Sequence, residues 1–125
     1  MNPVPVESLR TAWPVIRPLL EKLAKDTQQS WIAEDVYREV IQGTARLFLV
    51  DGGVLVTIPK VEEFTNAQVL HVWCGIGDGH DYESSLEALK EHAREFGFSK
   101  ITFESNREGW KKRFPMESIR YRIEL

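Results

Sequence analysis

A strand, a glycine-rich turn, an amphipathic helix and a second strand follow one another in the second half of the chain. The first strand is expected over residues 68–74, and the turn after it contains Gly75, Gly77 and Gly79. Apolar residues then recur at the spacing of one helix face in residues 82–96, at Leu86, Leu89, Ala93 and Phe96. A connection of this kind within one sheet is right-handed and makes its two strands parallel, so this segment constrains the fold more than any other.

The end of this helix and the strand that follows it are also marked in the sequence. Gly97 comes directly after the last apolar residue of the helix, where glycine is favoured because it tolerates positive φ. Residues 101–103 then provide a short run of strand-forming side chains. We expect a short helix over residues 106–114 and a closing strand over residues 119–125.

An antiparallel hairpin is expected upstream of this unit. Residues 45–50 and 54–58 are two apolar runs separated by the sequence Asp-Gly-Gly, which favours a tight turn. Pro59 should end the second strand because proline lacks the N–H group that a sheet ladder needs. Residues 60–67 are polar and are expected to form a loop, with strand at its start as the alternative.

An amphipathic stripe at helical spacing opens the chain and should end near Lys25. Its members are Leu9, Trp13, Ile16, Leu20 and Leu23. Pro14 and Pro18 interrupt this stripe, and each removes a backbone donor. We therefore expect either a kinked helix or a short turn followed by a helix that starts near Pro14.

A second helix is expected between Ser30 and Gly43. Ser30 is a suitable N-cap residue, and Gly43 a suitable stop. Ile32, Val36 and Val40 would line its buried face. The order of elements is then helix, helix, hairpin, strand, helix, strand, short helix and strand. It indicates an α+β or α/β fold with a mixed sheet and helices packed on it, in one domain spanning residues 1–125.

Composition and charge disfavour several classes of protein. The net charge is −3, with basic and acidic residues interspersed, so we expect no nucleic-acid partner. No apolar run approaches the roughly 20 residues that span a bilayer, and the first residues do not resemble a secretion signal. The one cysteine excludes a disulfide within the chain, which favours a reducing compartment.

Two segments, residues 93–101 and 106–114, carry a family resemblance. The first, Ala-Arg-Glu-Phe-Gly-Phe-Ser-Lys-Ile, is similar to the end of the main helix in the GNAT superfamily of N-acetyltransferases. The second, Asn-Arg-Glu-Gly-Trp-Lys-Lys-Arg-Phe, is similar to a segment of small GNAT-like proteins encoded by tailed bacteriophages. The resemblance covers the chain from Pro14 onwards. It implies a three-layer GNAT-like architecture with a central βαβ unit, and the family's first strand has no counterpart here.

The resemblance also implies where acetyl-CoA would bind. An active GNAT holds the pyrophosphate of acyl-CoA on backbone N–H groups at the start of its main helix. The matching loop here consists of Gly75, Ile76, Gly77, Asp78 and Gly79. The Arg or Gln of the family pattern is missing, and Asp81 and Glu83 add negative charge beside Asp78. We expect Asp81 to cap its own helix, which disfavours a bound cofactor.

The residues that would carry out acyl transfer are only partly present. Many GNAT enzymes use a Tyr as the acid for the leaving group, in a pattern that begins with an Asn; Asn106 fits that Asn, but Arg113 falls on the Tyr. A guanidinium stays protonated and cannot act as a general acid. Glu62, Glu63 and His71 precede or lie on the central strand and are candidates for a general base, with Glu62 and His71 the two that we retain.

A metal site is not expected. Cys74 lies near His71 and His80, but a structural zinc site needs four ligands and no second pair completes the set. In a regular strand His71 would point to the face opposite Cys74, because side chains alternate. An inert buried thiol is therefore expected for Cys74.

Three hypotheses for the function follow. The first is a non-catalytic GNAT-like bacteriophage protein without a cofactor, acting as an accessory or virion-associated protein through contacts with phage proteins, host proteins or further copies of itself. It would be found in the host cytoplasm or in the virion. The alternative is an active N-acyltransferase that uses acetyl-CoA on a small amine or a protein amine. The third is a small regulatory protein that binds another ligand in the same gap between the parallel strands.

Overall fold

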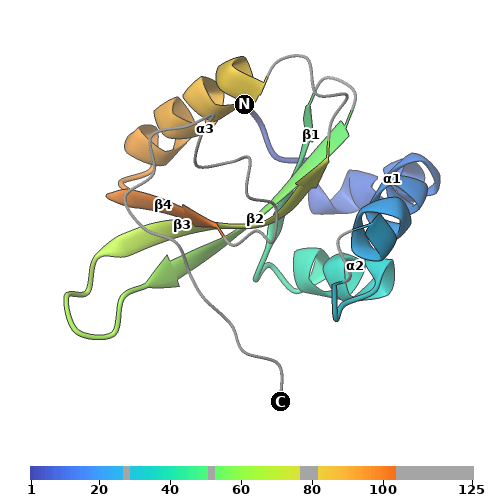
Figure 1. Cartoon of the computed structure of the whole chain (residues 1–125), viewed down its shortest axis with the longest axis horizontal. Helices are drawn as coiled ribbons and strands as arrows, with labels where there is room; N and C mark the ends of the chain where they lie inside the picture. Colours follow the sequence, from blue (N-terminus) through green and yellow to red (C-terminus); the bar gives the residue numbers. More distant parts are fainter. Residues whose placement is uncertain (27–28, 51–52, 77–81, 104–125) are drawn as a thin grey trace.

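A four-stranded mixed sheet with helices on both faces forms the structure (Figure 1). The computed structural model describes residues 1–26, 29–50, 53–76 and 82–103. Its elements are α1 (Val6–Asp26), α2 (Ala33–Ile41), β1 (Arg46–Val50), β2 (Gly53–Val61), β3 (Gln68–Ile76), α3 (Tyr82–Glu95) and β4 (Lys100–Phe103). The helix predicted over 106–114 and the strand predicted over 119–125 lie outside the described residues.

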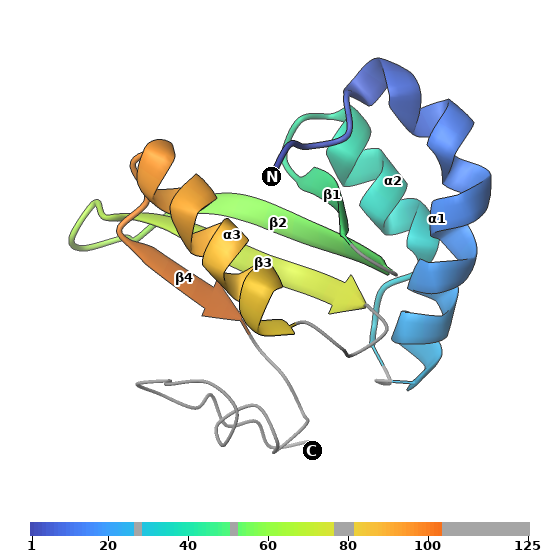
Figure 2. The same ribbon diagram turned by 90° about the horizontal axis from the view of Figure 1, so that it is seen from above.

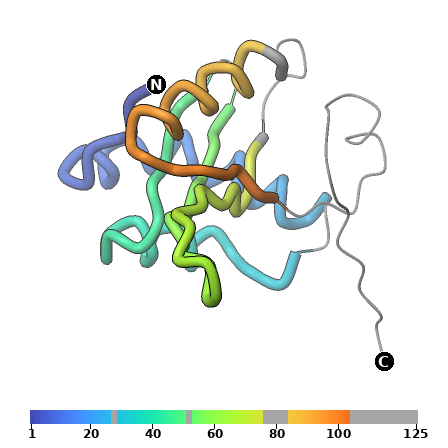
Figure 3. The backbone as a smooth tube through the Cα atoms, turned by 90° about the vertical axis from the view of Figure 1, so that its left-hand side faces the viewer, coloured from blue at the N-terminus to red at the C-terminus, as the bar shows by residue number. Residues whose placement is uncertain are grey.

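The strand order β1-β2-β3-β4 matches the predicted topology. β2 pairs antiparallel with both β1 and β3, and β4 pairs parallel with β3. Figure 3 follows the chain from α3 through a turn into β4, which runs along β3. The predicted hairpin and the predicted βαβ unit are therefore confirmed.

Two separate hydrophobic clusters cover the two faces of the sheet, which gives three layers (Figure 2). On one face α1 and α2 pack on side chains that include Leu47, Val54 and Val56. On the other face α3 packs through Leu89 and Ala93, against strand residues that include Leu55, Leu70 and Val72. Because successive strand residues point to opposite faces, Leu55 and Val56 belong to different clusters.

Helix α1 is one continuous helix that begins at Val6 and contains both prolines. The helix predicted from the apolar stripe is confirmed, and the alternative of a start near Pro14 is wrong. Pro14 and Pro18 are four residues apart and both are exposed. Water can therefore bond the carbonyl groups that their missing N–H groups leave unpaired, whereas the buried stripe lies on another face.

Helix α2 begins later than predicted. Its N-cap is Ile32 rather than Ser30, and the Ile32 N–H donates to Asp35 Oδ2 at 3.0 Å. As a cap residue Ile32 lies outside the helix and is 60% exposed, so its predicted place on the buried face is wrong. Val36 and Val40 are buried, and Gly43 follows the helix with φ +82°, as predicted.

Strand β2 continues through Pro59 to Val61, which corrects the predicted end at Pro59. The pairing with β1 stops at Thr57, so one side of β2 has no described strand partner beyond that residue. A proline can occupy such an edge, because no neighbour there requires its missing N–H. On the other side Pro59 lies opposite Leu70 of β3.

A short N-terminal segment lies beside β1. Pro3 forms an isolated antiparallel bridge with Phe48, and the Val4 N–H donates to the Leu47 carbonyl oxygen at 2.7 Å. The sequence indicated no counterpart of the strand that precedes the two helices in the GNAT fold. In the described residues before α1 the structure shows this one bridge and no strand. Among the described residues, no helix is long and apolar enough to cross a membrane.

Helix α3 ends as predicted before Gly97, whose φ is +82°. Phe96 lies just beyond the helix and is 53% exposed, so its predicted burial is wrong. His92 takes a buried position instead, with its ring centroid 5.1 Å from that of Phe48 and 4.6 Å from that of Phe96. Burial, and to a lesser extent the charge of Arg46, lowers the pKa of His92 below its usual 6.5.

The stability of the protein should fall as the pH falls below 6.5. The unfolded chain then binds a proton at His92 that the folded chain resists, which costs at most about 1.4 kcal/mol for each unit of pH. His92→Phe keeps an aromatic ring and should flatten this slope in urea denaturation between pH 7 and pH 5. Glu91→Gln, an exposed neighbour on α3, should keep it. Equal slopes in wild type and His92→Phe would show that His92 is not responsible.

Candidate functional site

The central strand β3 contains a β-bulge at Trp73. Val56 of β2 lies opposite Cys74, but the next residue, Thr57, lies opposite Val72, so Trp73 is an extra residue on β3. A bulge bends its strand and changes the face to which the following side chains point. Trp73 and Cys74, although adjacent, both pack in the cluster beneath α1 and α2.

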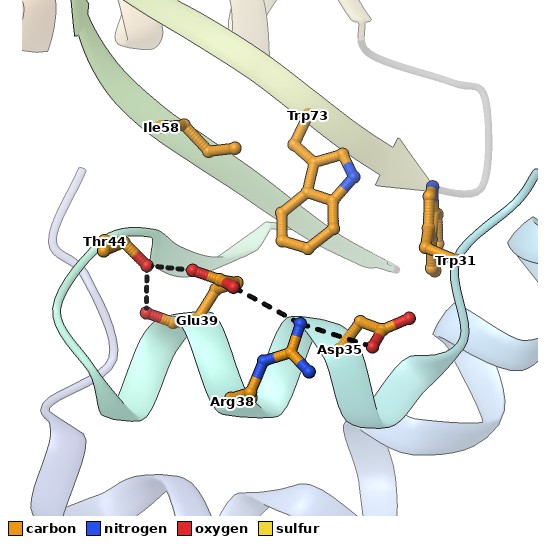
Figure 4. A pocket seen from close by; sticks show the side chains of 7 residues that line it. All are labelled: Trp31, Asp35, Arg38, Glu39, Thr44, Ile58 and Trp73. Carbon is orange, nitrogen blue, oxygen red and sulfur yellow. Dashed lines mark hydrogen bonds and ion pairs between the residues drawn. The ribbon is translucent and has the colours of Figure 1, made fainter.

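An open pocket of about 410 Å³ lies between α2 and this face of the sheet (Figure 4). Its lining residues are Trp31, Asp35, Arg38, Glu39, Thr44, Ile58 and Trp73. Ile58 of β2 and Trp73 of β3 form the side nearest the sheet, and α2 forms the opposite side. Trp31 comes from the segment just before α2 and closes one end.

The two indole rings of the pocket meet edge to face. The ring centroids of Trp31 and Trp73 are 5.9 Å apart, and the planes are inclined by 69°. Both side chains are half-buried. Trp73 lies two residues after His71, the partner of Ile58, so ordinary alternation puts it on the same face as Ile58, and the bulge adds Cys74 to that face.

Helix α2 contributes the charged groups of the pocket. The Arg38 Nη2 atom lies 3.5 Å from Asp35 Oδ1 and 3.5 Å from Glu39 Oε1. The Thr44 hydroxyl donates to the Glu39 carboxylate and also contacts the Glu39 carbonyl oxygen at 3.0 Å. The hydroxyl therefore fixes the position of the Glu39 side chain, and Asp35 is held by the Ile32 N–H.

The predicted cofactor loop is described only at its start. Gly75 and Ile76 are the last residues of β3, whereas Gly77, Asp78 and Gly79 lie outside the described residues. A Cβ atom added at Gly75 would meet Leu55 Cδ1 at 3.0 Å, which is tighter than ordinary contact. His80 and Asp81 also lie outside the described residues, as do Asn106 and Arg113.

Glu62, one of the two predicted general bases, is held in an ion pair. Lys100 Nζ lies 2.6 Å from Glu62 Oε1, and the Thr65 hydroxyl donates to the same carboxylate at 2.7 Å. The hydrogen bond from Lys100, followed by that from Thr65, lowers the pKa of Glu62 below its usual 4.5. Glu62 comes directly after Val61, the last residue of β2, whose partner on β3 is Gln68. Gln68 is about 16 Å along the strand from Trp73.

His71, the other predicted base, lies beside the pocket. It is the cross-strand partner of Ile58, which lines the pocket, and such partners share one face of the sheet. Its Nδ1 atom is 2.9 Å from the Thr102 Oγ1 atom on β4. The structure thus brings His71, and not Glu62, next to the candidate site.

Cys74 is the single cysteine, and it is buried. The sequence placed it on the face opposite His71, on the assumption of a regular strand. The bulge overturns that assumption: Val56 and Ile58, the partners of Cys74 and His71, lie on one face. Burial raises the pKa of the Cys74 thiol to about 12. The described residues contain no group of His, Cys, Asp and Glu that could hold a metal ion.

The Cys74 thiol should react very slowly in the folded protein. A thiol whose pKa is about 12 contains a vanishingly small thiolate fraction at pH 8. Alkylation by iodoacetamide at pH 8, followed by intact mass, should be at least about a hundredfold slower than in 6 M urea. Similar rates in the two conditions would show that the side chain is accessible and ionised, contrary to this account.

No family model and no curated protein matches the sequence. Solved structures do match the fold. A probable acetyltransferase has a TM-score of 0.68 at 13% identity, over 100% of this chain and 99% of that one. An aminoglycoside acetyltransferase from an uncultured soil sample, in complex with sisomicin, has 0.64 at 11%, over 99% and 94%. A GNAT family acetyltransferase from Staphylococcus aureus has 0.63 at 12%, over 99% and 96%. The chain therefore has the fold of GNAT acetyltransferases.

Proposed function

We propose that this protein is an N-acyltransferase that uses acetyl-CoA to acylate an amine bound in the pocket beside Trp73. The observation that carries the proposal is the bulged central strand. One strand contributes a pocket wall through Trp73, and the next described element along the chain is α3. An acceptor and an acyl donor could therefore be held against the same strand.

Two features of the β3 backbone support the binding of an acyl-CoA. In the described part of the chain, the pairing of β3 with β4 ends at Val72, so residues 73–76 have no described strand partner on that edge. The bulge also takes Trp73 out of the ladder with β2. Backbone polar groups on such an edge can bond a ligand, and the start of α3 offers further N–H donors.

Acetyl-CoA would supply a thioester whose acyl group passes to nitrogen. The C–N bond would form as the C–S bond breaks, CoA would leave as a thiolate that takes up a proton from water, and the amine would lose a proton. His71 is the best-placed candidate to accept that proton, directly or through water, because it neighbours Ile58 at the pocket and an imidazole suits proton transfer near neutral pH. The contact of His71 Nδ1 with Thr102 would hold the ring in one orientation.

Calorimetric titration with acetyl-CoA and with free CoA tests the donor half of the proposal. We expect micromolar binding, and we expect it to be lost in Gly77→Val, because a bulky side chain in the predicted cradle would block close approach of the backbone. His71→Gln should lower the rate of CoA release with an amine acceptor by about a hundredfold, whereas Glu62→Gln should change it little. Absence of acetyl-CoA binding at high protein concentration would sink the proposal.

A second candidate is a non-catalytic role through protein contacts, as in an accessory or virion-associated protein of a tailed bacteriophage. The phage-like segment at residues 106–114 and one exposed feature favour it. Phe64 is 91% exposed and Val61 65% exposed, both at the connection of β2 to β3. The Glu62 N–H donates to the Ala67 carbonyl oxygen at 2.9 Å, so this connection is an ordered turn that presents Phe64 outward.

Sedimentation velocity distinguishes this second candidate, a role through protein contacts, from the transferase. If Phe64 is a contact residue, the wild-type protein should associate at about 100 μM, and Phe64→Ser should sediment as a monomer, because interfaces depend on a few buried aromatic anchors. Glu63→Gln, in the same turn, should behave as wild type. A wild-type protein that stays monomeric and binds acetyl-CoA would leave the transferase as the better account.

A further inference from the structure

The lining of the pocket indicates the chemistry of its ligand. We propose that it binds a primary ammonium group carried on an apolar chain, and that an alkylamine of this class is the acceptor. That this amine is the acyl acceptor rests on the proposed function, whereas its binding in the pocket does not. Three properties of the lining support this class: an aromatic corner, two carboxylates on one helix face, and an apolar wall on the sheet.

The aromatic corner suits a cation. Trp31 and Trp73 stand at 69° with their centroids 5.9 Å apart, so a group in the angle between them can approach both rings. An organic cation within about 6 Å of an indole face is attracted by the ring quadrupole, and tryptophan is the strongest partner among the side chains. An anionic ligand such as a phosphorylated amine would be repelled by the same electron density.

The carboxylates of Asp35 and Glu39 are four residues apart and therefore lie on one face of α2, toward the pocket. Arg38 contacts both, but only at 3.5 Å, and its side chain is 59% exposed. Exposed ion pairs of this length contribute little, so Arg38 leaves both carboxylates able to bond an incoming ammonium. The three charges of the lining sum to −1, which again favours a cation.

The sheet side of the pocket selects what the ammonium is attached to. Ile58 and Trp73 form it, and their side chains offer an aliphatic surface and an indole ring. An alkyl chain packed there gains from the removal of apolar surface from water. The hydroxyl groups of an amino sugar would lose hydrogen bonds to water against the same surface, which disfavours that class.

Titration with pentylamine, in the absence of any acyl-CoA, tests this inference. The indole N–H signals of the four tryptophans are followed by NMR in ¹⁵N-labelled protein at pH 7.5. We expect saturable shifts of two signals, identified as Trp31 and Trp73 by single Trp→Phe variants. Pentylamine should bind at least about tenfold more tightly than pentanol, pentanoate or glucosamine.

Charge-matched variants locate the effect in the pocket. Glu39→Gln removes the charge and keeps an oxygen to accept the Thr44 hydrogen bond, so it should weaken pentylamine binding about tenfold without unfolding the protein. Glu34→Gln lies on the same helix, where Glu34 pairs with Arg17 instead, and should bind as wild type.

Two results would overturn the inference: equal affinity for pentylamine and pentanol, or equal binding by the Glu39→Gln and Glu34→Gln variants. Glucosamine binding as tightly as pentylamine would overturn the apolar part. Because no acyl-CoA is present in this titration, pentylamine binding can be confirmed even if the protein has no transferase activity. Acetyl-CoA can likewise be found to bind even if pentylamine does not.

Discussion

The irregular pairing of β2 with β3 is the interaction on which the rest of the structure depends. β3 is covered on both faces, by α1 and α2 on one side and by α3 on the other, and it pairs antiparallel with β2 and parallel with β4. A one-residue change of register along β3 would exchange its two buried faces. The bulge at Trp73 makes that exchange locally. Side chains up to Val72 alternate between the two faces in one phase, and side chains from Cys74 onward alternate in the opposite phase.

Local chemistry explains the part of the fold that the sequence predicts correctly. The stops at Gly43 and Gly97 and the apolar stripe of α1 each act within a few residues, so they can be predicted without knowledge of neighbouring elements. The wrong expectations concern contacts between elements. Pro59 remains in a strand because β1 has already ended beside it, and this depends on the length of another strand.

The candidate site shows the same division. Trp31, Asp35 and Glu39 are spaced by four residues. This spacing alone predicts that they lie on one side of α2 and of the segment just before it. None of the three is among the site residues predicted from the sequence. No local signal reveals the other half of the site, because two strands together set the register in which β2 and β3 pair, bulge included. For the same reason the faces of His71 and Cys74 could not be related from their separation along the chain.

The bulge also connects the fold to the proposed chemistry in physical terms. In a regular strand Trp73 and Cys74 would point to opposite faces, and Trp73 and Gly75 to the same one. With the bulge, Cys74 fills the core beneath the helices while Trp73 forms the wall of the pocket, and Gly75 takes the other face beside Leu55. A Cβ atom at Gly75 would lie 3.0 Å from Leu55 Cδ1, so packing within the sheet already favours glycine there. That preference is independent of any bound cofactor. The proposal of acetyl-CoA rests instead on the course of β3, which forms a wall of the pocket at Trp73 and is followed along the chain by α3.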